Sequence, residues 1–321
     1  MSRSGDPASA LRVLISVSSF GLADAAPLAR LESIGCQIIP NPYGRRLSED
    51  EIADLIGDVH VVIAGTEPLN ARVLRAAKEL KVISRVGVGL ENVDLNVALQ
   101  LGIAVRNTPD ALTDAVAELT LCGILSMARQ VARMDRELRA GEWNRHMGVL
   151  LRGKTVGIVG LGRIGRRLAE LLAPFRVELL ASDRAPDAEA AARLGVSIVE
   201  VNELFERSDI ISLHLPGLGH PIIGAAGIDQ MKPGVMLVNA SRGGLIDELA
   251  LAEALRDGQV GGAYIDTFVN EPYTGVLTDM PTAVLTPHAG SYAAETRAVM
   301  EFEAVDNMIT ALREFWPDDA P

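Results

Sequence analysis

The stretch TVGIVGLGRIGRRLAE, residues 155–170, decides the fold that we expect for this chain. It places Gly160, Gly162 and Gly165 in a Gly-x-Gly-x-x-Gly spacing, after an aliphatic run and at the start of a helical pattern. In such a turn the first glycine permits the sharp bend, the second lets the backbone approach a pyrophosphate, and the third lets helix and strand pack closely. The stretch therefore predicts a dinucleotide-binding strand–turn–helix unit. Taken alone, three glycines could also form a plain turn that binds nothing.

Two features beside the glycine turn support the prediction of a nucleotide-binding site. The amides of Arg163 and Ile164 lie where a predicted helix begins, and the positive end of its dipole would favour phosphates. A second aliphatic strand is predicted to end at Asp183, 18 residues after Gly165. A carboxylate in that place can accept hydrogen bonds from both hydroxyls of an adenosine ribose. We expect Asp183 to select NAD over NADP, because a 2′-phosphate would meet its negative charge.

Short aliphatic runs alternate with helical patterns along most of the chain, which indicates right-handed crossovers and parallel sheets. The expected strands are residues 12–18, 37–40, 60–65, 81–85, 103–106, 155–160, 177–183, 197–200, 210–215, 235–240, 261–265 and 283–286. The expected helices are residues 25–35, 48–57, 70–79, 94–101, 163–173, 187–194, 202–207, 225–231, 248–257 and 292–316. Residues 111–140 are predicted to form one long helix that links or braces domains.

We therefore predict an α/β protein of two doubly wound, Rossmann-like parallel-sheet domains with the active site in the cleft between them. Residues 1–108 together with 291–321 are expected to form the substrate-binding domain. Residues 109–290 are expected to form the NAD-binding domain.

Composition narrows the choice of partner. Lys and Arg total 30 against 42 Asp and Glu, and the net charge of −12 disfavours binding to nucleic acid. The uncharged run 210–228 contains two prolines and four glycines, so we expect no membrane span there. Cys36 and Cys122 are too few for a disulfide framework; we expect buried thiols in a cytoplasmic protein. His214 and His220 lack neighbouring ligands, and we expect no metal site.

Three polar residues follow predicted strands of the second domain: Arg242, Glu271 and His288. Each alone could be a surface or loop residue. Together they suit hydride transfer at C2 of a 2-hydroxy acid, since an imidazole can exchange the hydroxyl proton near neutral pH. A nearby carboxylate favours the imidazolium, and a guanidinium can bind a carboxylate through two parallel hydrogen bonds. The carboxyl ends of parallel strands are also where such sheets bind ligands.

Several motifs in order resemble the D-isomer-specific 2-hydroxyacid dehydrogenase family over about residues 11–316, and most closely its D-3-phosphoglycerate dehydrogenases without a C-terminal regulatory domain. The motifs are NPYGRRL (41–47), SRVGVGLENVDL (84–95), GIVGLGRIG (157–165), SDIISLHLP (208–216), MKPGVMLVNASRGGLID (231–247), DTFVNEP (266–272) and LTPHAGSY (285–292).

The resemblance implies roles for individual residues. Arg242, Glu271 and His288 match the catalytic arginine, acid and acid/base. The loop with Val88 and Gly89 would offer amides to the substrate carboxylate, with Val88 also near the nicotinamide. The positions that match cofactor-lining residues are Leu215, Pro216, Ala240, Ser241, Asp266 and Gly290. The resemblance also implies a homodimer that pairs through the NAD-binding domain.

The substrate is the least constrained feature. Arg45, Arg46 and Arg85 stand near ends of predicted strands in the first domain, and an anionic ligand would suit them. The resemblance places an arginine before the substrate loop of phosphoglycerate dehydrogenases, so we expect Arg85 to bind the phosphate of D-3-phosphoglycerate. Arg45 and Arg46 could equally be solvated turn residues.

Other functions stay open. A glyoxylate or hydroxypyruvate reductase, or another D-2-hydroxyacid dehydrogenase, is the first alternative. An NAD(H)-sensing binding protein of the co-repressor type is the second. Formate oxidation is the third alternative, but it resembles a branch of the family that lacks the acid partner, so Glu271 argues against that activity.

Overall fold

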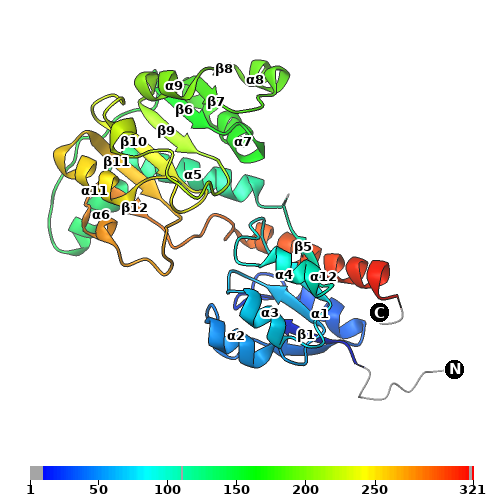
Figure 1. The fold of residues 1–321 in the computed structure, drawn as a ribbon. Coiled ribbons are helices and arrows are strands. Elements are labelled where there is room, and N and C mark those ends of the chain that lie inside the picture. Colours follow the sequence, from blue (N-terminus) through cyan, green and yellow to red (C-terminus); the bar gives the residue numbers. More distant parts are fainter. Residues whose placement is uncertain (1–9, 110, 318–319) are drawn as a thin grey trace. The chain divides into compact units, whose positions relative to one another are not determined.

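The computed structural model describes residues 10–109, 111–317 and 320–321. The chain divides into two units, each built on a parallel sheet with helices against it (Figure 1). Unit 1 comprises Met1–Leu112 and Ser291–Pro321, and unit 2 comprises Thr113–Gly290. The predicted fold class, two Rossmann-like α/β domains, is confirmed.

Unit 1 holds a five-stranded parallel sheet in the order β2-β1-β3-β4-β5. Its strands are β1 (Arg12–Ile15), β2 (Gln37–Pro40), β3 (Val61–Ala64), β4 (Val82–Arg85) and β5 (Ala104–Asn107). Its helices are α1 (Ala26–Ser33), α2 (Glu49–Leu55), α3 (Ala71–Ala76), α4 (Leu95–Gln100) and α12 (Ala294–Phe315). The C-terminal helix α12 packs against β4, β5 and α1, so the end of the chain completes the unit in which it began.

Unit 2 holds a seven-stranded parallel sheet in the order β12-β11-β10-β9-β6-β7-β8. Its strands are β6 (Thr155–Val159), β7 (Glu178–Ser182), β8 (Val196–Ile198), β9 (Ile210–Leu213), β10 (Val235–Asn239), β11 (Val260–Ile265) and β12 (Ala283–Leu285). Its helices are α5 (Thr113–Ala128), α6 (Val131–Arg139), α7 (Arg163–Leu172), α8 (Ala188–Leu194), α9 (Val201–Arg207), α10 (Ala225–Ile228) and α11 (Glu248–Asp257), with 3₁₀ turns η2 (Ala173–Phe175) and η3 (Val276–Asp279).

The strand order of unit 2 has a functional consequence. The chain runs outward from β6 through β7 to β8, and then returns to β9 on the other side of β6. The order therefore reverses between β6 and β9, and open α/β sheets bind ligands at the carboxyl ends of strands beside such a switch point. The Gly160 turn follows β6 directly, so it lies at this position.

The local sequence explains where the helices begin. Ser48 caps α2 in a capping box with Glu51, as the serine–glutamate spacing predicts. Asn70 caps α3 by accepting hydrogen bonds from the amides of Arg72 and Val73. Apart from residues 111–140, the predicted strands and helices are confirmed, with ends that differ by three residues or fewer.

The prediction of one helix over residues 111–140 was wrong. The structure has α5 and α6 instead, bent by 65° at a break where Gln130 adopts φ 56°. The break contains neither glycine nor proline, so nothing in the local sequence indicated it. Helix α5 packs against α7, β10 and β11 within unit 2, which explains the apolar residues on its inner face.

The prediction of two buried thiols was also wrong. Cys122 is exposed, because it lies on the outer face of α5, and Cys36 is partly exposed beside the edge strand β2. No single described helix is long and apolar enough to cross a membrane. The pair α5 and α6 reaches that length and composition only together, across its bend, and half of the α5 residues are buried in the unit.

Candidate active site

The glycine turn of unit 2 has the geometry that a dinucleotide requires. Gly160 has φ 96°, and a Cβ there would lie 2.4 Å from the carbonyl oxygen of His214. A Cβ on Gly165 would lie 2.3 Å from the carbonyl oxygen of Gly160, so helix and turn touch through backbone alone. Gly162 is the N-cap of α7, and a Cβ there would meet no atom within 4 Å. The space in front of the α7 N-terminus is thus open, and a pyrophosphate fits it.

Asp183 holds this turn in place. Its Oδ2 accepts a hydrogen bond from the amide of Leu161 at 2.7 Å, and its Oδ1 accepts one from the amide of Ala185 at 2.9 Å. The end of β7 is therefore tied to the turn after β6. The carboxylate lies next to the glycine turn, which is where an acid that binds an adenosine ribose is expected.

The other predicted cofactor-lining residues follow neighbouring strands of the same sheet. Leu215 and Pro216 come after β9, Ala240 and Ser241 after β10, Asp266 after β11, and Gly290 after β12. Ser241 Oγ donates to the carbonyl oxygen of Leu213 at 2.5 Å, which joins the ends of β9 and β10. These residues share one edge of the sheet with the glycine turn. Asp266 differs from the other residues of this set, because its carboxylate accepts hydrogen bonds from the amides of Ala289 and Gly290.

His288 and Glu271 form a direct pair. The Nδ1 atom of His288 lies 2.9 Å from Glu271 Oε2 and 3.1 Å from Oε1. Glu271 Oε1 also accepts a hydrogen bond from the amide of Phe268 at 3.1 Å, and the Glu271–Pro272 peptide bond is cis. The His288 side chain remains 41% exposed, so its other nitrogen can reach a substrate. This geometry is that of an oriented general acid/base.

The backbone of His288 is also unusual. Its φ of 52° lies in the left-handed region, which costs a non-glycine residue roughly 1–2 kcal/mol. The surrounding fold must therefore hold this conformation, because a free loop would leave it.

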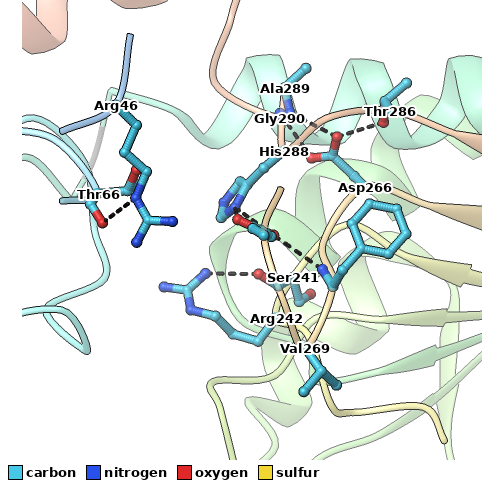
Figure 2. A network of polar contacts seen from close by, with 12 residues as sticks. Arg46, Thr66, Ser241, Arg242, Asp266, Val269, Thr286, His288, Ala289 and Gly290 are labelled. Atoms are coloured by element: carbon cyan, nitrogen blue, oxygen red, sulfur yellow. Dashed lines mark hydrogen bonds and ion pairs between the residues drawn. The ribbon is translucent and has the colours of Figure 1, made fainter. Parts of the chain in front are cut away.

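Arg242 stands on the loop after β10. Its Nη1 donates to the carbonyl oxygen of Ser241 at 2.8 Å, and the side chain points out from the loop on the same side as His288 (Figure 2). Asn239 fixes this loop: its side-chain amide donates to the carbonyl oxygen of Arg242 at 2.8 Å and its Oδ1 accepts from the amide of Ser241 at 3.1 Å. The structure thus brings all three predicted catalytic side chains to one edge of the unit 2 sheet.

The predicted substrate loop of unit 1 is well anchored. The amide of Gly87 donates to Thr108 Oγ1 at 2.8 Å, and Asn107 donates to the carbonyl oxygen of Val88 at 2.8 Å. The Arg85 guanidinium donates to the carbonyl oxygen of Val86 and lies where a Cβ of Gly87 would be. Arg85 therefore folds over the loop that ends in Val88 and Gly89.

The two arginines of the NPYGRRL turn differ from each other. Arg45 forms an ion pair with Glu51 through Nη2 at 2.6 Å and lies over the ring of Tyr43. Arg46 donates from Nε to the carbonyl oxygen of Thr66 at 3.0 Å (Figure 2). The ion pair with Glu51 neutralises Arg45, and the Arg45 side chain is 58% exposed, so the solvated-turn interpretation fits Arg45.

Sequence reasoning missed two buried polar residues that shape these loops. Asn239 is 2% exposed at the end of the aliphatic strand VMLVN, and an amide in that place could have been noticed. Glu67 is 1% exposed and bonds to Ser16 Oγ and to the amide of Gly65, which joins the ends of β1 and β3. Nothing in its sequence context distinguishes Glu67 from a surface glutamate. Among the described residues, no group of three His, Cys, Asp or Glu side chains is placed to hold a metal ion.

Comparison with known proteins shows which family this chain is similar to. The profile of the D-isomer specific 2-hydroxyacid dehydrogenase, NAD binding domain, matches residues 121–290. A D-3-phosphoglycerate dehydrogenase of Mycobacterium leprae is 39% identical over 264 residues, which cover 80% of this chain and 50% of that protein. A glyoxylate reductase of Aeropyrum pernix is 37% identical over 283 residues, covering 84% of this chain and 83% of that protein.

A solved structure of a protein from Thermus thermophilus superposes with a TM-score of 0.85 and 34% identity, covering 94% of this chain and 97% of that one. The chain spans about half the length of the D-3-phosphoglycerate dehydrogenases that it matches. NAD is the cofactor that the matched domain binds, and the glycine turn fits it. The chain belongs to the D-isomer specific 2-hydroxyacid dehydrogenase family.

Proposed function

We propose that this protein is an NAD-dependent dehydrogenase of D-2-hydroxy acids. The observation that carries the proposal is the His288–Glu271 pair, with Nδ1 and Oε2 at 2.9 Å, on the same sheet edge as the glycine turn. Such a pair suits proton exchange with a hydroxyl or carbonyl oxygen at C2 of the substrate. When bound, NAD would accept the hydride that leaves C2.

Each side chain then has a task. In oxidation His288 takes the proton of the C2 hydroxyl, and in reduction it returns a proton to the carbonyl oxygen. Glu271 stabilises the imidazolium that forms after the first of these steps. Arg242 binds the substrate carboxylate, and we assign the amides around Val88 and Gly89 the same task.

The substrate that we propose first is D-3-phosphoglycerate, which would be oxidised to 3-phosphohydroxypyruvate. Relatives with that name are 38–40% identical to this chain. The arginines of unit 1 supply cationic groups for a phosphate, and Arg85 adjoins the substrate loop. The experiment is a scan of NAD reduction against a panel of D-2-hydroxy acids, followed by the KM of Arg85→Ala for D-3-phosphoglycerate and D-glycerate.

We expect Arg85→Ala to raise the KM for D-3-phosphoglycerate about tenfold or more, since a charge-assisted contact contributes ~1.5–3 kcal/mol. The KM for D-glycerate should change much less. Arg45→Ala is the matched control, because Arg45 already pairs with Glu51. Equal weakening of both substrates by Arg85→Ala would remove the phosphate role and favour an unphosphorylated acid.

A second candidate is glyoxylate or hydroxypyruvate reductase. Its support is that the glyoxylate reductases of Aeropyrum pernix and Thermococcus litoralis match over 83% and 77% of their own length, at 37% identity. The same panel, run in the direction of NADH oxidation with glyoxylate and hydroxypyruvate, separates the two. Tight NADH binding without turnover of any acid would instead favour the NAD(H)-sensing function.

We further propose that the protein acts in the cytoplasm as a homodimer, on small molecules and without nucleic acid or membrane partners. The net charge of −12 supports the exclusion of nucleic acid. The described cysteines, Cys36 and Cys122, are both free, which suits a reducing compartment.

A further inference from the structure

A chain of hydrogen bonds holds the loop that carries the candidate catalytic residue His288. The residue that bonds directly to this loop is Asp266, which follows β11 and is 0% exposed. The carbonyl oxygen of Asp266 accepts from the amide of His288 at 2.8 Å. Its Oδ1 accepts from the amide of Ala289 at 2.8 Å, and its Oδ2 from the amide of Gly290 at 2.9 Å (Figure 2). One residue therefore fixes three successive amides of the loop that carries His288.

The chain continues into the core of unit 2. Thr286 Oγ1 lies 2.5 Å from Asp266 Oδ1, and Tyr264 Oη lies 3.0 Å from Thr286 Oγ1. A threonine hydroxyl has one hydrogen and a carboxylate can only accept, so Thr286 donates to Asp266 and Tyr264 donates to Thr286. Burial raises the pKa of Tyr264, so the phenol keeps the hydrogen that it donates. In this chain of hydrogen bonds, Tyr264 is therefore the first donor, Thr286 passes the bonding on, and the Asp266 carboxylate is the final acceptor.

We propose that Asp266, Thr286 and Tyr264 are positioning residues that hold His288 in its left-handed conformation and so aim its imidazole. The family resemblance places Asp266 among the residues that line the cofactor. In the structure its Oδ1 also accepts from Thr286 and Ala289 and its Oδ2 from Gly290, so the same carboxylate holds the histidine loop while Oδ2 keeps a lone pair for one further donor. Glu271 orients the imidazole ring from one side, whereas the Asp266 chain sets the backbone from which the ring projects. A displacement of about 1 Å in a catalytic group can cost about a hundredfold in rate.

The test compares three variants with the wild-type chain. Thr286→Val keeps the shape of the side chain and removes the hydroxyl, Thr286→Ser restores it, and Asp266→Asn replaces one acceptor oxygen by a donor. Thr120→Val is the matched control, because Thr120 is also buried in unit 2 but bonds only to Val116 of its own helix. The first measurement is the hydrogen exchange of the Ala289 and Gly290 amides in the cofactor-free protein. The second is kcat together with the Kd for NADH.

We expect exchange at both amides to accelerate about tenfold in Thr286→Val and more in Asp266→Asn, with recovery in Thr286→Ser. The kcat should fall about fivefold to tenfold in Thr286→Val and about a hundredfold in Asp266→Asn, while the Kd for NADH changes less than about threefold in Thr286→Val, because Thr286 is not among the residues expected to line the cofactor. Thr120→Val should match the wild type in all three quantities.

Two results would overturn the proposal. One is unchanged amide exchange in both Thr286→Val and Asp266→Asn. The other is a loss of NADH affinity with unchanged kcat in Thr286→Val, which would mean that the chain supports the cofactor site and not the position of His288. The kinetic measurement rests on the proposed dehydrogenase function, whereas the exchange measurement does not. If the wild-type chain oxidises no acid, exchange alone decides between a positioning chain and none.

Discussion

His288 has two ring nitrogens with different tasks, and the contacts separate them. Glu271 accepts from Nδ1 at 2.9 Å, which leaves Nε2 as the atom that exchanges a proton with substrate. A carboxylate that orients the base in this way is the arrangement expected of an activated imidazole.

We therefore predict that His288→Ala lowers kcat by about 10²–10⁴-fold, because proton transfer loses its group. NADH affinity, measured by fluorescence titration, should stay close to the wild-type value. Glu271→Gln serves as the graded comparison: it keeps the hydrogen-bond geometry and removes the charge that stabilises the imidazolium, so kcat should fall less than in His288→Ala. A wild-type kcat in Glu271→Gln would show that the carboxylate charge does not assist His288.

The catalytic residues of this site could be predicted from the sequence, but the contacts that hold them in place could not. Arg242, Glu271 and His288 each follow an aliphatic run, so their place at strand ends is visible in the chain. Asn239 and Asp266 act through contacts with residues that only the tertiary fold brings near. The left-handed backbone of His288 carries no glycine signal either.

The packing of α5 on β11 depends on a close approach that one added side-chain atom would prevent. Gly123 of α5 faces the ring of Tyr264 on β11, and a Cβ at Gly123 would lie 2.2 Å from that ring. Tyr264 is 1% exposed, so its ring has no solvent-side path by which to move away.

Gly123→Ala should therefore destabilise unit 2, although alanine is the better helix former. The gain in helix propensity is about 1 kcal/mol, whereas overpacking a core costs about 1–3 kcal/mol or more. Urea unfolding should show a lower midpoint for Gly123→Ala. Gly123→Ala combined with Tyr264→Phe should recover nothing, because the ring remains, whereas adding Tyr264→Leu should restore part of the midpoint. A midpoint at or above the wild type for Gly123→Ala alone would contradict this packing argument.

The elements themselves were largely predictable because aliphatic strands of a parallel sheet are buried on both faces and stand out as continuous runs. The bend at Gln130 was not, since residues 113–128 and 131–139 both have helical patterns. Its cause is tertiary: α5 is apolar and packs inside unit 2, whereas no residue of α6 is buried.

The stability of the whole chain should depend on pH through His214. Burial lowers the pKa of this imidazole to about 4. Its Nδ1 has no hydrogen-bond partner among the residues that the structure describes, and its Nε2 lies 2.9 Å from Ser212 Oγ. The unfolded chain binds a proton at His214 near pH 6.5, so between about pH 6.5 and 4 the unfolded state holds more protons than the folded state. The free energy of unfolding must then fall as the pH falls through that window.

We expect this one group to remove at most about 3 kcal/mol between pH 7 and pH 4. Urea midpoints at several pH values measure the effect, and His214→Gln should flatten the acid side of the curve. His220→Gln is the matched control, because His220 is exposed and in the same segment. Equal slopes for wild type and His214→Gln would show that other groups carry the acid sensitivity.

The exposed apolar residues of unit 2 predict that the chain forms a dimer. Five large apolar residues on α6 and the segment after it are uncovered: Val131, Leu138, Trp143, Met147 and Leu150 are 52%, 57%, 78%, 95% and 69% exposed. The segment 142–150 has neither helix nor strand, yet it is anchored by the Val149 amide on the carbonyl oxygen of Ala128 at 2.8 Å and by His146 on Glu137 at 2.6 Å. Several large apolar side chains exposed on one helix and its anchored continuation favour a protein–protein contact, and a second copy of the chain is the partner that the family resemblance implies. Sedimentation at micromolar concentration should give twice the chain mass of 34.1 kDa.

The double variant Trp143→Arg with Met147→Glu should sediment as a single chain, whereas Leu99→Glu, at a site 80% exposed in unit 1, should not change the mass. A wild-type mass near that of one chain would contradict the dimer and leave these residues to another partner.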